Sequence, residues 1–354
     1  MAKVEDIYWS MYQEFEGPFY RGKTKFEIPK SPSLQDKYLA VITTIESGHY
    51  DAINMYDRMI LTVGLIQWGE ANTFSVSKLL GAICDSGKES VVQEHLKPAL
   101  KISNSSFRKN HKGIWRFFIG DSEVNSIALQ QQLFLGCDGR KGKWNNELRM
   151  YAKTWAAAMA SVFEDPHTHE IQKKFTMDRL MGFVPAEVKK SLFDDKTSAP
   201  WADATRTIYL TFAINLPRVA GEMFSSTKFV GKKWSQEWCI SLIKRLTFGP
   251  NIKIYPKRYD ALRPIVESLF GVDLPNNSVE LEKWSFIPPK EVKPIIISAP
   301  IDARPVSTST INKELINELN AIVAAPPLKL EKNPSFLGFL FDMIKKFFLL
   351  FNRK

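Results

Sequence analysis

The sequence predicts an α+β protein that is mostly helical, followed by a C-terminal extension of different composition. The chain of 354 residues holds 24 Phe, 10 Tyr and 9 Trp, which is enough large apolar side chain for a sizeable core. Within residues 36–46, Leu39, Ile42 and Ile45 recur at the spacing of one helix face. Turn-forming residues and a short apolar run between 50 and 66 then predict a small β-hairpin.

Composition divides the chain into three segments. Residues 1–285 mix helical and extended patterns without an internal repeat, so we expect one domain there. Residues 286–334 carry eight of the 20 prolines and no glycine, which predicts a stiff, extended spacer. Apolar residues at helical spacing predict a short helix at about 310–324 within this spacer.

The last segment, residues 335–354, predicts an amphipathic helix. Its apolar and mostly aromatic side chains share one broad helical face, whereas Asp342, Lys345 and Lys346 lie on the opposite face. The segment is shorter than the roughly 20 apolar residues that span a bilayer, and charges interrupt it. We therefore expect contact with a membrane surface. Docking on the domain's own core or on a partner protein stays open as the alternative.

Charge and cysteine content restrict the class of partner and site. The 48 Lys and Arg exceed the 38 Asp and Glu and give a net charge of +10, which favours polyanionic partners. Cys84, Cys137 and Cys239 show no C-x-x-C spacing, and no H-E-x-x-H occurs, so we expect no metal and no cofactor. A Cys-His peptidase that uses Cys84 or Cys137 stays open as a weaker alternative. Acids stand where a signal peptide carries cations, so we expect no signal peptide.

Three smaller clusters have ordinary explanations. His167-x-His169 lacks a third ligand at a recognised spacing, so we expect a solvated loop rather than a metal site. The basic residues of 108–116 alternate with aromatic residues, and we expect a helix with a solvated basic face rather than a nucleic-acid site. The glycine-rich basic stretch 139–143 predicts a surface turn, or a contact to an anionic polymer.

Glu46 is the first candidate for chemistry. It falls on the last turn of the helix predicted over 36–46, on the same side as the apolar stripe, and Ser47-Gly48 then ends the helix. The negative end of the helix dipole and the apolar neighbours both favour the protonated form of a carboxyl group. Such a carboxyl can give a proton to a leaving group near neutral pH.

Asp57 is the candidate for a second carboxylate. It follows Glu46 on a predicted turn or hairpin that can fold back toward the helix end. Two carboxyl groups that face one groove are the arrangement that glycoside hydrolysis uses. Asp51 is an alternative for this role, and Asp57 could instead cap its own turn. A mechanism with Glu46 alone therefore stays open.

The residues around both carboxyls carry a family resemblance. Glu46-Ser47-Gly48, followed by Thr62-Val63-Gly64-Leu65-Ile66-Gln67, resembles the lysozyme-like superfamily of goose-type lysozymes and lytic transglycosylases. The resemblance places the catalytic glutamate on Glu46 and groove-lining residues on Gly64 and Gln67. The stretch Asp57–Gly64 is also similar to the chitosanase branch, whose second carboxylate falls on Asp57.

Further residues extend and limit this resemblance. The segment 208–217 resembles a helix that ends in Asn-x-Pro in phage peptidoglycan-degrading proteins, which places Asn215 in the cleft. Trp68, beside the motif, would stack on sugar rings if it is exposed. The chain departs from the chitosanase pattern because the glycines around Asp57 are missing and the spacing from Glu46 is shorter. Ile66 also stands where the family has methionine.

The resemblance implies a two-lobed lysozyme-like catalytic domain over 1–285, with the small β-hairpin at its cleft. It implies a peptidoglycan hydrolase of the muramidase or lytic transglycosylase type that cleaves β-1,4 glycosidic bonds. Peptidoglycan is preferred over chitosan because a protein of charge +10 repels a polycation, so a chitosanase is a further alternative. We expect a bacteriophage protein, made in the host cytoplasm, that acts at the cell envelope as an endolysin or is carried in a virion. The rival is a non-enzymatic virion component with a degenerate lysozyme-like fold that binds partner subunits, and nucleic acid is the least favoured partner.

Overall fold

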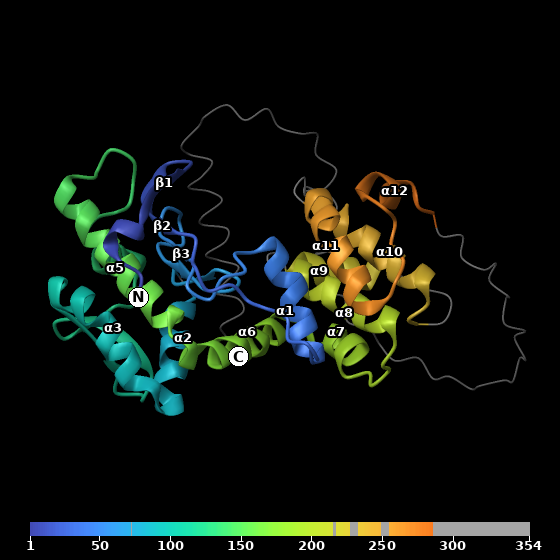
Figure 1. Cartoon of the computed structure of the whole chain (residues 1–354), viewed down its shortest axis with the longest axis horizontal. Coiled ribbons are helices and arrows are strands. Elements are labelled where there is room, and N and C mark those ends of the chain that lie inside the picture. The colour runs from blue at the N-terminus through green and yellow to red at the C-terminus, as the bar shows by residue number, and fades with distance from the viewer. Residues whose placement is uncertain (72, 215–216, 227–232, 249–254, 286–354) are drawn as a thin grey trace, which may run out of the picture. The chain divides into compact units, whose positions relative to one another are not determined.

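A computed structural model describes residues 1–285 apart from residue 72 and the segments 215–216, 227–232 and 249–254 (Figure 1). These residues belong to the first of two compact units, Met1–Val292 and Lys293–Lys354. The expected spacer 286–334 with its helix at 310–324, the expected amphipathic helix 335–354 and the candidate Asn215 lie outside the described residues.

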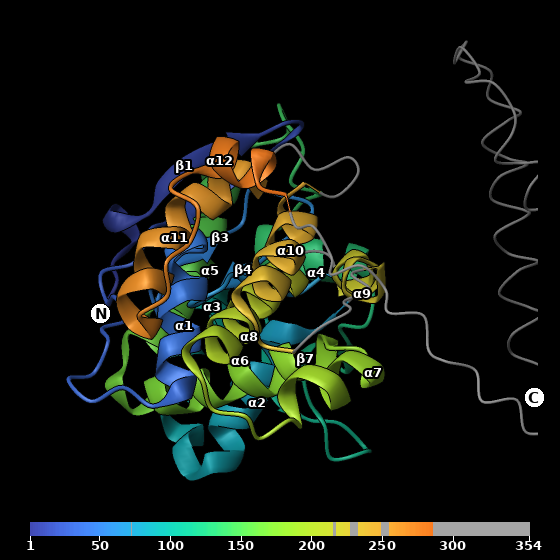
Figure 2. The ribbon, with the colours of Figure 1, turned by 90° about the vertical axis from the view of Figure 1, so that its right-hand side faces the viewer.

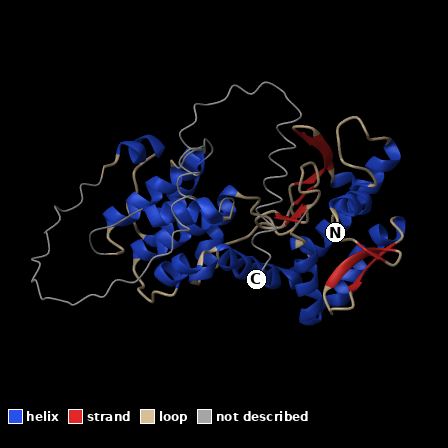
Figure 3. Ribbon diagram, turned by 180° about the vertical axis from the view of Figure 1, so that it is seen from behind, coloured by secondary structure: helices blue, strands red, loops and turns tan. Residues whose placement is uncertain are grey.

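The described residues form an α+β structure that is mostly helical and has two small antiparallel sheets (Figure 3). The first sheet has five strands in sequence order: β1 (Tyr8–Tyr12), β2 (Phe15–Tyr20), β3 (Ile53–Asn54), β4 (Thr62–Val63) and β5 (Trp68–Gly69). The pairing of β3 with β4 confirms the predicted hairpin within residues 50–66. The hairpin of β1 and β2, which precedes it along the chain, was not predicted.

Helix α1 (Leu34–Ile45) connects β2 to β3 and confirms the helix predicted over 36–46. A capping box begins it, because Ser33 accepts a hydrogen bond from the backbone of Asp36 and the Asp36 carboxylate accepts one from the backbone of Ser33. The helix buries Leu39 and Ile42 completely or nearly so, as the apolar stripe requires. Glu46 is the C-cap residue, with extended backbone angles.

The second sheet corrects the prediction for residues 108–116. This segment is not helical, because β6 (Ser105–Lys109) pairs with β7 (Trp115–Ile119), and β8 (Ser122–Glu123) pairs with β7. The turn between β6 and β7 is held by the Asn110 side chain, whose Oδ1 accepts hydrogen bonds from two backbone N–H groups of the turn. The aromatic residues of this region therefore alternate along strands and are not spaced around a helix.

The remaining helices and helical turns pack around these sheets and α1. Their bounds are η1 (Val4–Asp6), α2 (Ser75–Ile83), η2 (Cys84–Lys88), α3 (Glu89–Ile102), α4 (Ile127–Leu135), α5 (Asn146–Glu164), η3 (Pro166–Thr168), α6 (His169–Phe183), α7 (Ala186–Val188), η4 (Lys189–Phe193), α8 (Pro200–Ala213), α9 (Pro217–Ser226), α10 (Gln236–Thr247), α11 (Tyr255–Phe270) and α12 (Ser278–Lys283). Helix α5 packs on α3 and on the first sheet, whereas α1 packs on α8 and α11 (Figure 2). Helix α6 contacts both α2 and α8.

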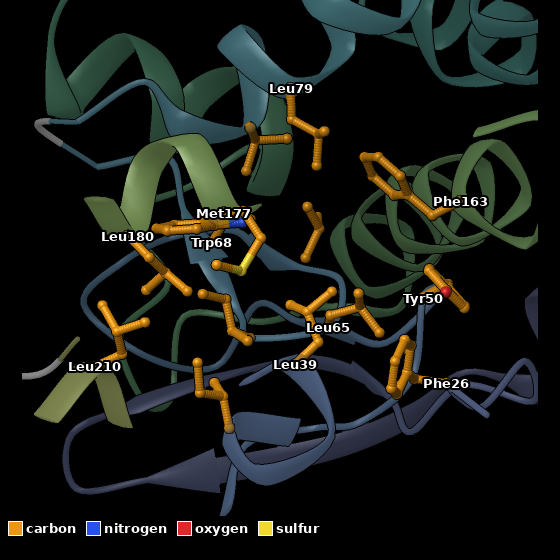
Figure 4. Close-up of a cluster of buried hydrophobic side chains, with 14 of the residues drawn as sticks. Phe26, Leu39, Tyr50, Leu65, Trp68, Leu79, Phe163, Met177, Leu180 and Leu210 are labelled. Atoms are coloured by element: carbon orange, nitrogen blue, oxygen red, sulfur yellow. The ribbon is translucent and has the colours of Figure 1, made fainter. Parts of the chain in front are cut away.

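The buried apolar side chains form one continuous core. Figure 4 shows part of this core, where buried side chains of α1, of the chain after it and of α6 gather, among them Leu39, Leu65, Trp68, Met177 and Leu180. Within residues 1–285, apart from the gaps given above, no helix has both the length and the apolar character that crossing a bilayer requires.

Candidate active site around Glu46

Glu46 lies at the end of α1 and lines a pocket of about 800 Å³. Its side chain is 14% exposed, and its Oε1 lies 3.8 Å from Nη1 of Arg258 on α11, whose side chain is 18% exposed. The guanidinium group also lies over the ring of Tyr255, 5.5 Å from the ring centroid. The carboxyl group is therefore largely shielded from solvent, reaches the pocket and has a cationic partner.

The wall of the pocket opposite α1 is an extended segment that pairs with the chain after Glu46. The backbone N–H of Phe26 donates to the Gly48 carbonyl (2.9 Å), and the N–H of Tyr50 donates to the Thr24 carbonyl (2.8 Å). This pairing places Arg21, Lys25 and Glu27 on the pocket lining with Glu46 and His49. The pocket therefore combines one half-buried carboxyl with exposed cationic and anionic groups.

The structure brings together the two motifs that carry the family resemblance. The Ser47 hydroxyl donates to the carbonyl of Gly64 at 2.6 Å, and the carbonyl of Leu65 lies 3.1 Å from the same hydroxyl. The backbone N–H of Gly48 also donates to the Leu65 carbonyl (3.2 Å). These hydrogen bonds fix the end of α1, and with it Glu46, against the chain between β4 and β5.

Gly64 and Gln67 both have roles inside the fold. Gly64 has φ +81°, and a Cβ at this position would overlap the Oε1 of Gln172, a buried residue of α6. That same oxygen accepts a hydrogen bond from the backbone N–H of Leu65 (2.9 Å). The side-chain oxygen of the half-buried Gln67 accepts a hydrogen bond from the Thr62 hydroxyl (2.7 Å). The pocket lined by Glu46 does not include Gly64 or Gln67.

Trp68 does not present a face to solvent, which corrects the expectation that it stacks on sugar rings. Its side chain is 5% exposed and its indole N–H donates to the Thr176 hydroxyl (3.1 Å). Phe175 packs edge-on against the indole ring, at 5.9 Å between centroids. Because both its ring and its polar group are engaged within the core, Trp68 anchors α6 to β5.

The carboxylates of Asp57 and Asp51 accept hydrogen bonds from nearby backbone N–H groups. The Asp57 carboxylate accepts hydrogen bonds from the Met59 backbone (2.7 Å) and from the Asn54 side chain (3.0 Å), which is the turn-capping alternative. Burial raises the pKa of Asp57 above its ordinary value, although these hydrogen bonds oppose the shift. Asp51 is fully buried and accepts hydrogen bonds from the backbone N–H groups of Lys23 and Thr24. Neither aspartate lines the pocket of Glu46.

The other predicted clusters hold no second reactive centre among the residues that the structure describes. No group of three or more His, Cys, Asp or Glu side chains there could hold a metal ion. The ring of His167 instead lies 2.8 Å from the Asp165 carboxylate at the start of a helical turn. Burial raises the pKa of the Cys84 thiol to about 12 and also raises the pKa of Cys137, so neither thiol is activated as a nucleophile.

Sequence reasoning missed Arg258 and the charged residues Arg21, Lys25 and Glu27 of the pocket lining. Arg258 reaches Glu46 only through the packing of α11 on α1, and no local pattern in the sequence signals such a long-range contact. No family model, no curated protein and no solved structure matches this chain. What supports a function is therefore the set of residues and contacts in the chain itself.

Proposed function

We propose that this chain is a peptidoglycan hydrolase of lysozyme-like, two-lobed architecture that cleaves β-1,4 glycosidic bonds between amino sugars. The observation that carries the proposal is the position of Glu46. A shielded carboxyl ends a helix, reaches a pocket, and is held there by hydrogen bonds between the two motifs that resemble the lysozyme-like superfamily.

In the proposed reaction Glu46 is the general acid. Its carboxyl gives a proton to the glycosidic oxygen while the bond between that oxygen and the anomeric carbon breaks, and the positive charge develops on the sugar ring. A nucleophile then attacks the anomeric carbon and returns a proton to the Glu46 carboxylate. Water as nucleophile leaves a reducing end, whereas a hydroxyl of the same sugar leaves an anhydro end.

The proposal assigns the acid–base role to Glu46 alone. Both oxygens of Asp57 accept hydrogen bonds from its own turn, and Asp51 holds the backbone of residues 23 and 24. Neither aspartate lines the pocket, so neither is placed to activate water beside Glu46. The single-carboxylate alternative that the sequence left open is the one that these contacts favour.

The surroundings of Glu46 fit an anionic glycan. Arg21 and Lys25 line the pocket together with Glu27, and Arg258 lies 3.8 Å from the Glu46 carboxylate. Peptidoglycan carries carboxylates on its sugars and stem peptides, and these would be attracted by guanidinium and ammonium groups. The polycation chitosan would be repelled by the same side chains. We further propose, on the resemblance alone, that the enzyme is phage-encoded and acts on the bacterial envelope, either as an endolysin or from a virion.

The test is digestion of purified peptidoglycan by the full chain and by Glu46→Gln, with the soluble products identified by mass spectrometry. We expect the wild type to release muropeptides and the variant to release them about 10²–10⁴-fold more slowly, because the proton donor is lost. Glu147→Gln, which changes an exposed carboxylate on α5, is the matched control and should be fully active. Equal release by all three proteins, or no release by any, would overturn the proposal.

The ion pair between Glu46 and Arg258 favours a second candidate, a non-enzymatic virion component with a degenerate site. A guanidinium at 3.8 Å stabilises the ionised carboxylate, whereas a general acid must hold a proton. If the chain digests neither peptidoglycan nor chitosan but sediments with virion proteins, the structural role takes the place of the enzymatic one. Digestion of chitosan alone would instead identify a chitosanase.

A further inference from the structure

The outward side of the β1–β2 hairpin carries paired aromatic residues. Tyr8 lies opposite Phe19 and Tyr12 lies opposite Phe15 in the antiparallel register, so each pair shares one face of the sheet. Ser10 and Gly17 are the pair between them; the backbone of Met55 and Tyr56 crosses over Gly17 on this side, whereas Ser10 on the outer strand is half-buried. The ring of Tyr56 packs edge-on against Phe19, with the centroids 5.8 Å apart.

The opposite side of the same hairpin faces the domain. Trp9 packs on the ring of Trp144, at 4.6 Å between centroids, and lies under the guanidinium of Arg149. Tyr20 is buried in the core, and α5 packs on β2. Because successive strand residues alternate between faces, the side chains of Tyr8 and Tyr12 point to the side opposite Trp144 and α5.

These outward aromatic residues are accessible. Tyr8 is 64% exposed and Tyr12 is 55% exposed, while Phe15, Phe19 and Tyr56 are half-buried. We call this surface, made of Tyr8, Tyr12, Phe15, Phe19 and Tyr56, the hairpin face. Tyr8 and Tyr12 are roughly 14 Å apart along the strand, which is long enough for more than one sugar ring.

A basic loop adjoins the hairpin face. The backbone N–H of Glu16 donates to the Gly139 carbonyl (3.0 Å), and the N–H of Lys141 donates to the Glu14 carbonyl (2.9 Å). Between these bonds Arg140 lies opposite Phe15, so its side chain is on the aromatic side of the sheet. Arg140 and Lys141 are both exposed. The hairpin face therefore has one cationic group, Arg140, at the end where the hairpin turns.

We propose that the hairpin face is a second binding surface for the glycan strand of the bacterial cell wall, separate from the pocket of Glu46. The apolar faces of pyranose rings would pack on Tyr8 and Tyr12, and Arg140 would bind a carboxylate of the strand. The choice of peptidoglycan as the glycan rests on the proposed function. Binding at this surface needs no proton from Glu46.

Charge density favours a glycan over a single-stranded nucleic acid on this surface. A nucleic acid carries a phosphate at every nucleotide and needs a continuous row of cations. Here the register places Arg140 on the hairpin face, whereas Glu16 lies opposite Met11 and Lys141 follows Arg140, so both belong to the other face. Sparse carboxylates on a largely uncharged sugar backbone match a single cation better than a row of phosphates does.

The experiment is co-sedimentation of the full chain with insoluble peptidoglycan, performed in the Glu46→Gln background so that the ligand is not digested. We expect the double substitution Tyr8→Ala and Tyr12→Ala to weaken binding by about tenfold or more, and Arg140→Gln to weaken it less. Met11→Ala is the matched control, because Met11 lies on the same strand, is 52% exposed and belongs to the other face. It should bind like the parent protein.

Three results would overturn the inference. The first is equal binding by the tyrosine double variant and Met11→Ala. The second is displacement of the parent protein from the wall by single-stranded DNA at low concentration, which would make the surface a nucleic-acid site. The third is a parent protein that dimerises through these tyrosines, as shown by sedimentation velocity of the double variant. The proposed enzymatic activity is tested separately, by digestion of soluble glycan fragments with the wild type and with the tyrosine double variant. A loss of wall binding can thus be told apart from a lack of enzymatic activity.

Discussion

Replacing Gly64 by alanine tests how tightly the chain at Gly64 and Leu65 packs against the end of α1 and against α6. Gly64 has φ +81°, and the left-handed region costs an alanine about 1–2 kcal/mol. The new Cβ would also overlap the Oε1 of Gln172, which accepts the hydrogen bond of the Leu65 N–H (2.9 Å). Displacing that oxygen leaves a buried N–H without its partner, which costs about 1–3 kcal/mol more. We therefore expect Gly64→Ala to lower the free energy of unfolding by about 2–5 kcal/mol.

Gly113→Ala separates the two contributions. Gly113 has φ +72°, but no atom lies within 4 Å of a Cβ placed there, so only the backbone cost applies. Equilibrium unfolding in urea should show Gly64→Ala to be less stable than Gly113→Ala by about 1–3 kcal/mol. In a Gln172→Ala background this excess should largely disappear, because the overlapping oxygen is gone. Equal losses for the two glycine variants would refute the packing that we describe around Ser47 and Gly64.

Three other residues, Asp57, Cys84 and Cys239, give direct tests. Asp57→Asn should keep peptidoglycan digestion within about threefold of the wild type, because Asn can accept the same backbone hydrogen bond; a loss as large as that of Glu46→Gln would instead make Asp57 the second carboxylate. Since burial raises the pKa of Asp57 in the folded protein, its contribution to stability is fully present below the unfolded pKa and is lost as pH rises through the folded pKa. The urea midpoint of the wild type should therefore fall relative to that of Asp57→Asn as the pH rises above about 4, the ordinary pKa of an aspartate, and a constant difference would contradict this. Cys84 and Cys239 are buried, and burial raises the pKa of each thiol to about 12. Iodoacetamide should therefore alkylate them only after the protein unfolds, which mass spectrometry can measure. Rapid labelling of either thiol in the native protein would contradict the packing around it.

The elements that could be predicted from the sequence are those whose signals lie within the element itself. The helix that ends at Glu46 has both a capping residue and a regular apolar stripe, and the structure begins and ends it within two residues of the prediction. Residues 108–116 were assigned to the wrong element, because their aromatic residues were given more weight than the turn at Asn110 and Gly113. In the structure that turn joins two strands.

The N-terminal hairpin was missed for a different reason. Its two-residue turn is Gln13-Glu14, and Gln13 takes a positive φ of 54° without being glycine or asparagine. A turn without its usual residues leaves no local signal in the sequence. The hairpin is stabilised instead by tertiary contacts, through Trp9 on Trp144 and the backbone hydrogen bonds to residues 139 and 141.

The candidate site also contains some features that local sequence signals predict and others that depend on long-range packing. The position of Glu46 at a helix end could be predicted from local signals, and Ser47 does contact Gly64, but Gly64 is not part of the pocket that Glu46 lines. Arg258 could not be predicted, because the contact depends on how α11 packs on α1. The environment of Trp68 was also beyond local reasoning, since its burial is decided by α6.

The contact of Arg258 with Glu46 sets a limit on how this protein can be shortened. Besides Arg258, helix α11 supplies the Leu269 carbonyl that accepts a hydrogen bond from the Lys37 ammonium of α1 (3.2 Å). Helix α12 in turn packs against α10 and α11. A truncated form that stops before Tyr255 would keep every recognisable motif of the N-terminal half and yet expose one side of the helix that carries the acid. Fragments for crystallography, directed evolution or fusion to other proteins should therefore extend at least through Lys283.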